Sequence, residues 1–408
     1  MSGIETITML SGLVYLLLFQ WHERSGWSWL PFLMLTAAVW LTVAAKPPLS
    51  SLIVLAVAIG MLYRYKLISV LYDSGDQQLR SLVRYFLVIS WGFVTIQYGV
   101  YIFQLHQGDL PWLSRPDIVD GFLPIAGGLG LRALLSLGIT DYHHPAATIT
   151  VLVISLSGLI LGRAFCSWFC PLGVVGEWLH HFRNLLLPGE WTPPKWLDLL
   201  LKSQKFLVLS FLMFIVILAV PNVALPGYLM SQFHQAADMK MGAFFFNLNF
   251  ISGIFVVWVL SVTMLFKQGF CRYLCPYGGW LSLLGLLTPL RIRRSSSSCL
   301  RSKGYDCDKC SRACPSRILV HALISVRNIE CTNCLTCISA CPKQANAIHF
   351  GTANKMVSAK NLLTMLCVLL LLMPLFAHII FDFWTSNTPL EQRRYLLDGN
   401  PPEKLRCS

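Results

Sequence analysis

The chain has 408 residues, of which 55% are hydrophobic and only 12% are charged. Soluble domains contain about 25% charged residues, so this composition excludes an ordinary soluble enzyme and a disordered chain. The formal net charge of +13 is typical of a membrane protein with basic cytoplasmic loops, and it does not indicate a nucleic-acid partner.

Apolar runs along the chain predict a polytopic α-helical membrane protein. A run of about 17 residues or more can cross the hydrocarbon core of a bilayer as a helix. Runs of about this length occupy residues 4–21, 27–45, 49–65, 82–105, 146–162, 206–220, 250–266 and 362–380, which predicts about eight spans.

A further apolar segment, residues 121–140, does not fit this series because Pro124, several glycines and Arg132 interrupt it. Broken backbone at membrane depth needs protein or water around it. A re-entrant segment and a loop followed by a short surface helix both fit this pattern.

The loops alternate between basic and nearly neutral. Lys and Arg are concentrated in residues 64–84, 163–205 and 267–360, and they are sparse in residues 106–145 and 221–249. Because basic loops stay in the cytoplasm, we expect a multi-pass protein of the bacterial inner membrane, with both termini in the periplasm.

The motif F-C-x3-C-P-x-G occurs twice, each time after an apolar run. The first copy contains Cys166 and Cys170, and the second contains Cys271 and Cys275. Cysteines four apart share one helix face, and both copies leave the membrane on the same side. We therefore expect the four thiols to form one redox or metal site, either an additional iron–sulfur site, another metal site or a dithiol relay. Separately packed cysteines are the alternative.

A second cysteine pattern fills the long polar loop between the last two apolar runs. The run C-x2-C-x2-C-x3-C-P is typical of bacterial 4Fe–4S proteins, and its fourth cysteine ligates the other of two clusters. It predicts one cluster on Cys314, Cys331, Cys334 and Cys337, and a second on Cys299, Cys307, Cys310 and Cys341.

Cys299 is the less regular member, since a seven-residue insertion, LRSKGYD, separates it from Cys307. A non-cysteine ligand and a 3Fe–4S cluster are alternatives there. Zinc is a weaker interpretation of the whole loop, because zinc sites usually pair two C-x2-C units or combine Cys with His.

These patterns divide the chain into four parts. We expect N-terminal transmembrane helices at 1–81, a duplicated transmembrane core at 82–290, a small ferredoxin-like α+β segment at 291–360, and a C-terminal helix with a periplasmic tail at 361–408. Asp141 and His143 precede the apolar run at 146–162, and a base at the membrane surface suits quinol oxidation. They are the predicted quinone site.

The two F-C-x3-C-P-x-G motifs followed by a double 4Fe–4S segment resemble the polyferredoxin-type membrane proteins of the NapH, NosR and CcoG kind. The resemblance implies electron transfer between the quinone pool or a cytoplasmic donor and a periplasmic redox protein or partner subunit, as in a quinol dehydrogenase. It also implies two alternatives, namely a CcoG-like metal-reducing assembly factor and a redox-sensing regulator.

Overall fold

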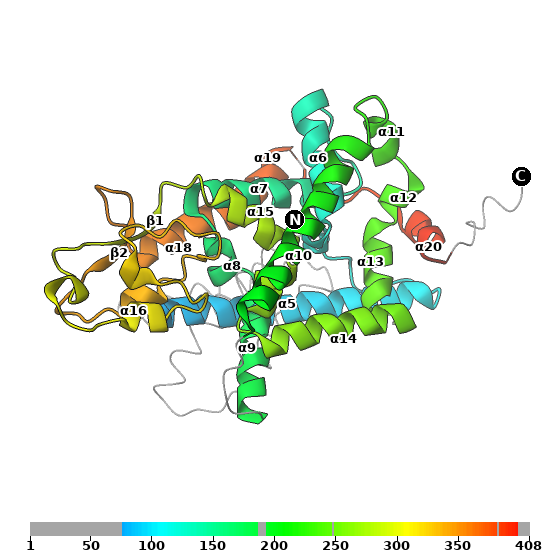
Figure 1. Ribbon diagram of the computed structural model, residues 1–408. Coiled ribbons are helices and arrows are strands. Elements are labelled where there is room, and N and C mark those ends of the chain that lie inside the picture. The colour runs from blue at the N-terminus through cyan, green and yellow to red at the C-terminus, as the bar shows by residue number, and fades with distance from the viewer. Residues whose placement is uncertain (1–75, 187–192, 247–248, 382, 399–408) are drawn as a thin grey trace, which may run out of the picture.

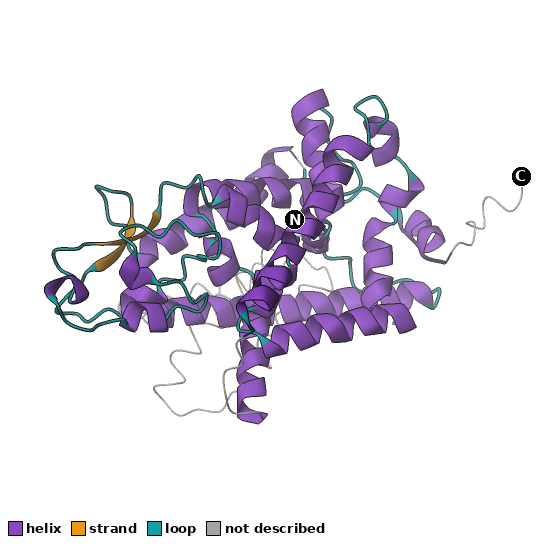
Figure 2. Ribbon diagram, viewed as in Figure 1, coloured by secondary structure: helices purple, strands orange, loops and turns teal. Residues whose placement is uncertain are grey.

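A computed structural model of the protein describes residues 76–186, 193–246, 249–381 and 383–398. This part of the chain is mainly helical and contains a single two-stranded sheet (Figure 2). The predicted spans at 4–21, 27–45 and 49–65 lie outside the described residues.

Two helices of the described part are long and apolar enough to cross a membrane. These are α5 (Asp76–His106) and α10 (Lys195–Phe214), which continues into a π-helical turn (Ile215–Ala219). The pair α13 (Ala237–Phe246) and α14 (Phe250–Leu265) adds a third candidate if the two helices, bent by 78°, form one span. Eight spans are therefore not confirmed.

Two other predicted spans correspond to shorter helices. Residues 146–162 form α7 (Pro145–Leu161), which is bounded by Pro145 and by Gly162 at a φ of 61°. Residues 362–380 form α18 (Ala359–Cys367), a π-helical turn (Val368–Leu372) and α19 (Met373–Phe381). Proline at a first turn and glycine with positive φ are common helix boundaries, which accounts for the short α7.

The interrupted segment 121–140 begins at the end of a 3-10 helix, η1 (Asp117–Phe122), and contains the 14-residue helix α6 (Pro124–Leu137). Helix α6 packs on α7. A Cβ atom on Gly127 would lie 2.5 Å from the carbonyl oxygen of Ala147, so only glycine permits this close approach. The segment is helical but shorter than a span, and its re-entrant placement stays a prediction.

Residues 291–360, called the ferredoxin lobe below, lie at one end of the molecule (Figure 1). Strand β1 (Arg291–Arg294) pairs antiparallel with β2 (Ile348–Gly351), with Ile292 opposite Phe350 and both side chains buried. The short helices α16 (Lys309–Arg312) and α17 (Thr336–Ser339) carry cysteines of the two runs.

One apolar core joins the lobe to the helices beside it. Leu161 and Trp168 belong to the same buried cluster as Ile292, Leu335 and Phe350. The lobe is thus packed directly against the first F-C-x3-C-P-x-G motif.

The remaining helices complete the framework. They are α8 (Ala164–Trp168), α9 (Pro171–Leu186), α11 (Leu225–Leu229), α12 (Gln232–Gln235), the π-helical η3 (Phe270–Leu274), α15 (Pro276–Leu284), the 3-10 turns η4 (Arg301–Lys303) and η5 (Val320–Ala322), and α20 (Leu390–Asp398). In Figure 1, α11, α12 and α20 lie at the end opposite the lobe.

Candidate redox centre

Four cysteines of the ferredoxin lobe surround one cavity. Its lining includes Cys314, Cys331, Cys334 and Cys337, together with apolar side chains such as Ile292 and Val326. The backbone reverses between them, since Asn333 and Leu335 have positive φ values of 47° and 60°. Such values are uncommon for residues other than glycine and wrap the chain around the cavity. The structure brings together the set of thiols that the spacing assigns to one cluster.

The surroundings of these thiols suit an iron–sulfur cluster. Thr336 donates a hydrogen bond from Oγ1 to the Cys334 sulfur at 3.3 Å. Burial raises the pKa of Cys331 to about 12, so this thiol becomes a thiolate at neutral pH only when a bound cation compensates its charge. Hydrogen bonds to sulfur and exclusion of water both tune cluster potentials.

The predicted ligands of the second cluster are less completely gathered. Burial raises the pKa of Cys310, and the charge of Cys341 adds to this effect. Burial would raise the pKa of Cys299, but the side chain of Arg294 and the backbone of Arg301 and Ser302 outweigh this effect and lower the pKa. The assignments of Cys299 and Cys307 stay predictions.

The ligand atoms of the lobe cysteines stand further apart than those around a single zinc ion. In the described part of the chain, no cysteine belongs to a set of three ligand atoms within 4.8 Å of one another. The thiolates of one zinc ion, each about 2.3 Å from the metal, would satisfy that limit. Ligands of a cubane bind different iron atoms and stand further apart.

The four thiols of the two F-C-x3-C-P-x-G motifs, called the membrane-edge thiols below, also lie around one cavity. Cys166, Cys170, Cys271 and Cys275 all line an apolar cavity of about 280 Å³, called the thiol cavity below. A hydrogen bond from Cys271 lowers the pKa of Cys170. Burial raises the pKa of Cys275 to about 12. The two copies of the motif therefore contribute to one site, whose chemistry stays a prediction.

The motif glycines explain how the copies fold. A Cβ atom on Gly173 would lie 2.6 Å from the carbonyl oxygen of Cys166, and one on Gly278 would lie 2.8 Å from that of Cys271. Real Cβ atoms do not make such contacts, so only glycine lets α9 and α15 begin this close to the preceding turn. Pro171 and Pro276 start these helices, because proline suits the first helical position.

A buried ion-pair contact joins the two sets of thiols. Glu330 accepts hydrogen bonds from Lys205 at 2.6 Å and from Arg163 at 3.4 Å. Burial alone would raise the pKa of Glu330, but the two cations outweigh it and lower the pKa, which keeps the carboxylate ionised. Arg163 also donates to the carbonyl oxygen of Cys271 at 3.2 Å. Glu330 directly precedes Cys331, so this contact connects the two motifs.

A second contact runs through Trp168, which is fully buried. Its indole nitrogen donates to the carbonyl oxygen of Asn333 at 3.1 Å, and the Asn333 amide donates to the carbonyl oxygen of Leu161 at 2.9 Å. Trp168 lies between Cys166 and Cys170 in the sequence, and Asn333 lies between Cys331 and Cys334. An indole ring thus bridges the two centres.

The residues of the predicted quinone site, Asp141 and His143, lie outside the two cavities that the cysteines line. Asp141 accepts hydrogen bonds from the backbone N–H groups of His143 and His144 at 3.0 and 3.1 Å, and from the His234 ring at 2.8 Å. His143 contacts Thr388 through its ring at 2.9 Å. Neither Asp141 nor His143 lines the thiol cavity. Their polar atoms stabilise the start of α7, and their assignment to a quinone site stays a prediction.

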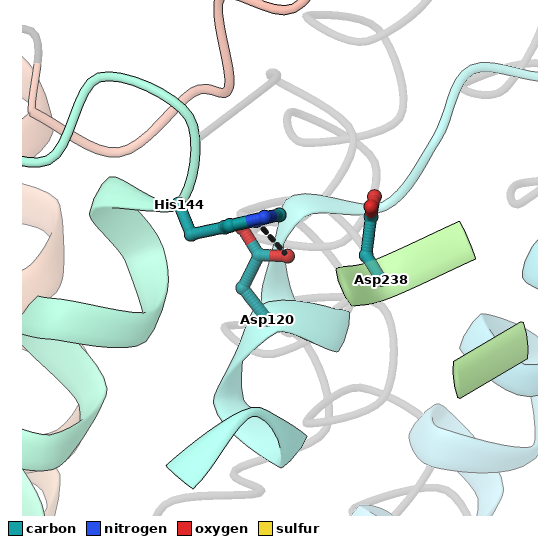
Figure 3. A group of neighbouring side chains, drawn as sticks. All are labelled: Asp120, His144 and Asp238. Carbon is teal, nitrogen blue, oxygen red and sulfur yellow. Dashed lines mark hydrogen bonds and ion pairs between the residues drawn. The ribbon is translucent and has the colours of Figure 1, made fainter. Parts of the chain in front are cut away.

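These residues belong to a buried ionic network that also includes Asp120, His144 and Asp238 (Figure 3). One ligand atom from each lies within 4.8 Å of the others, which is the spacing of a cation site. However, the guanidinium of Arg115 forms ion pairs with both Asp120 and Asp238. Its charge already balances the carboxylates, so we interpret the group as an ion-pair network. The sequence pattern does not predict this network, although Arg115, Asp117 and Asp120 lie within six residues of one another.

The network should make stability depend on pH through His144. Burial disfavours its charged form, but Asp120 outweighs this effect and raises the pKa of His144 from 6.5 to about 9. A raised pKa in the folded state adds stability that is fully present below pH 6.5 and is lost as the pH rises through 9. The expected loss is about 3 kcal/mol.

Thermal unfolding of the detergent-solubilised protein across this pH range checks the prediction. The His144→Gln variant should lose most of the slope, whereas His321→Gln, in the lobe, should retain it. Equal slopes in the wild type and His144→Gln would contradict the assignment.

Comparisons with known proteins identify relatives of this chain. A family described as "4Fe-4S binding domain" matches residues 142–188 and 248–295, the segments that contain the two F-C-x3-C-P-x-G motifs. The chain is 35% identical to the putative electron transport protein YccM of Escherichia coli K12 over 71% of this chain and 81% of that protein.

More distant relatives carry similar names. The ferredoxin-type protein NapH of Haemophilus influenzae is 24% identical over 50% of this chain and 68% of its own. The regulatory protein NosR of Stutzerimonas stutzeri is 24% identical over 47% of this chain and 25% of its own. No solved structure matches the chain. The motifs, the gathered thiols and these relatives place the chain in the family of ferredoxin-type 4Fe–4S membrane proteins that includes YccM, NapH and NosR.

Proposed function

We propose that the protein is a membrane-bound electron carrier that moves electrons between iron–sulfur clusters in the ferredoxin lobe and a quinone in the thiol cavity. A periplasmic redox protein or partner subunit would exchange electrons with this pair. The observation that carries the proposal is the buried contact of Glu330 with Lys205 and Arg163, because it fixes one thiol set against the other.

The residues of this chain would have distinct tasks. The eight lobe cysteines would hold two clusters, which exchange single electrons when bound. Trp168 and the chain around Cys331 would keep the lobe within electron-transfer distance of the thiol cavity. The four membrane-edge thiols would form a third centre, as an iron–sulfur site, another metal site or a redox-active dithiol.

The walls of the thiol cavity support an aromatic, apolar ligand. Trp91 and Phe122 pack edge to face at 5.0 Å, and Tyr277 and Trp384 complete an aromatic lining. A volume of about 280 Å³ suits the ring of a quinone rather than a whole lipid molecule. Tyr277 donates to the carbonyl oxygen of Gly121 at 3.1 Å and so fixes η1 as one wall.

Charge favours a cytoplasmic position for the lobe. Its exposed surface includes Arg301, Lys303 and Arg312, and the positive-inside rule assigns such segments to the cytoplasm. The iron–sulfur centres would then face the cytoplasm, and α11, α12 and α20 would face the periplasm.

The four thiols also support a second candidate, a metal-handling factor. Soft thiolates select Cu(I), and a cavity with four of them could receive that ion from a donor. Binding of about one Cu(I) per chain at the thiol cavity, with no reaction between reduced clusters and quinone, would favour this function.

Reoxidation of reduced protein by a quinone tests the proposed function. Purified protein would be reduced with stoichiometric dithionite and mixed with menadione, and the visible cluster absorbance would be followed in a stopped-flow instrument. Filling the cavity by Thr150→Phe, or removing a thiol by Cys271→Ala, should slow reoxidation by about tenfold or more.

Ferricyanide, a small anionic oxidant, serves as the control and should reoxidise all three proteins at similar rates. Cys367→Ser is the matched thiol control, because Cys367 lines neither cavity. If menadione reoxidises Thr150→Phe and Cys271→Ala as fast as the wild type, the quinone does not react through the thiol cavity.

A further inference from the structure

A second large cavity, of about 540 Å³, lies between α5, α9 and the ferredoxin lobe. We call it the basic cavity. Its lining includes Arg80, Arg84 and Tyr85 of α5, Trp178 of α9, Lys267 and Thr336. Apart from Thr336, which contacts the Cys334 sulfur, the proposed electron path uses none of these residues, so the cavity requires an explanation of its own.

The charges in the basic cavity favour an anion. Among the described residues that line it, Glu177 is the only acidic one, and it pairs with Arg84 at 2.6 Å and with Arg80 at 3.4 Å. Three cations thus face one carboxylate. The buried Nε of Arg84 has no hydrogen-bond acceptor among the described residues. An anionic oxygen would satisfy this donor, and arginine is well suited to phosphate.

The aromatic side chains favour a planar ring. Tyr85 and Trp178 lie with ring centroids 5.6 Å apart and planes inclined by 33°. Their side chains remain 38% and 43% exposed, although both rings line the cavity. Exposed faces of this kind stack on flat heterocycles, and they lie beside the cationic groups.

The cavity is also close to a predicted cluster ligand. Arg80 donates to Oγ1 of Thr336 at 3.3 Å, and Thr336 donates to the sulfur of Cys334 at 3.3 Å. Gln77, which also lines the cavity, donates to the carbonyl oxygen of Cys334 at 3.2 Å. A molecule in the cavity would therefore be separated from the Cys334 thiolate by a single side chain.

We propose that the basic cavity binds a flavin nucleotide, which exchanges electrons with the lobe. This inference rests on the proposed function for its redox role but not for the binding itself. A phosphate would meet Arg84 and Lys267, and the isoalloxazine ring would lie against Tyr85 and Trp178. Volumes of 300–1,000 Å³ are usual for ligands of this size.

The electron balance suits a flavin. A reduced flavin releases two electrons and two protons, and each electron reduces one oxidised cluster of the lobe while the protons pass to water. A nicotinamide is less suitable, because it transfers its two electrons together as hydride and a single cluster accepts one.

Binding of flavin mononucleotide to the full-length protein in phosphatidylcholine nanodiscs tests the proposal through quenching of flavin fluorescence. We expect saturable binding, weakened about tenfold or more by Arg84→Gln and about threefold by Lys267→Gln. Riboflavin, which lacks the phosphate, should bind about tenfold more weakly. Arg301→Gln, on the exposed part of the lobe, is the matched control and should bind like the wild type.

Three results would overturn the proposal. The first is that flavin mononucleotide does not bind saturably to the folded wild type. The second is that flavin mononucleotide and riboflavin bind equally well. The third is that flavin mononucleotide binds to both Arg84→Gln and Lys267→Gln as it does to the wild type. Loss of binding in phosphatidylglycerol nanodiscs would also overturn it, since the cavity would then be a site for anionic lipid headgroups. The assay does not require cluster turnover, so a failure here is distinguishable from failure of the quinone experiment.

Discussion

Replacing Cys337 by serine should remove about four iron atoms from the anaerobically purified protein, because one complete cluster depends on this thiol. Cys337 is buried and lines the same cavity as Cys314, Cys331 and Cys334. Since the binding free energy of a structural metal group is also folding free energy, the lobe should become the least stable part of the variant.

Iron analysis and limited proteolysis check this prediction together. The variant should be cleaved within residues 291–360 under conditions that leave the wild type intact. Cys367→Ser, which alters a partly buried cysteine in α18, should retain the full iron content. A Cys337→Ser protein with wild-type iron content would show that Cys337 is not a cluster ligand.

Removing the Glu330 carboxylate should have the second large effect. Glu330→Ala leaves the buried cations of Arg163 and Lys205 without their partner, and their side chains are only 2% and 0% exposed. Breaking a buried pair in this way costs about 3–5 kcal/mol. The lobe should separate more readily from the membrane-edge motif, so electron exchange between reduced clusters and menadione should also slow.

Hydrogen–deuterium exchange across residues 326–340 and stopped-flow reoxidation measure the two consequences. Asp308→Ala is the matched control, because its ion pair with Arg312 is exposed and such pairs contribute about 0–1 kcal/mol. If Glu330→Ala shows the same hydrogen–deuterium exchange and the same reoxidation rate as Asp308→Ala, the ion pairs of Glu330 do not connect the two centres.

Cysteine spacing predicted much of the candidate site because ligand chemistry acts over short distances in the sequence. The C-x2-C-x2-C pattern groups Cys331, Cys334 and Cys337, and the structure places them around one cavity. The repeated motif similarly suggested a shared place for Cys166 and Cys271. In both cases, the turns next to the cysteines, which contain proline or glycine, allow few other positions for the thiols.

The contacts between distant segments could not be predicted in the same way. Glu330 meets Lys205 across 125 positions, and Asp141 meets His234 across 93. Nothing in the sequence near these residues indicates the partner, because tertiary packing selects it. The basic cavity was missed for the same reason, since α5, α9 and the lobe each contribute only part of it.

The span count illustrates a different limit. The length of an apolar run is read directly from the sequence, but the run does not show whether its residues form one unbroken helix. Residues 146–162 and 362–380 satisfy the first criterion, yet Pro145 and Gly162 bound α7, and a π-helical turn separates α18 from α19. An apolar run of spanning length therefore does not guarantee one uninterrupted α-helix of 18 residues or more.

The central claim is that two neighbouring iron–sulfur clusters lie in a lobe packed against the membrane core. Electron paramagnetic resonance of the anaerobically reduced full-length protein tests this claim most directly. About eight irons per chain in the lobe and a broadened spectrum from two interacting spins are predicted. Bound zinc in place of iron, or the spectrum of a single isolated cluster, would contradict the account.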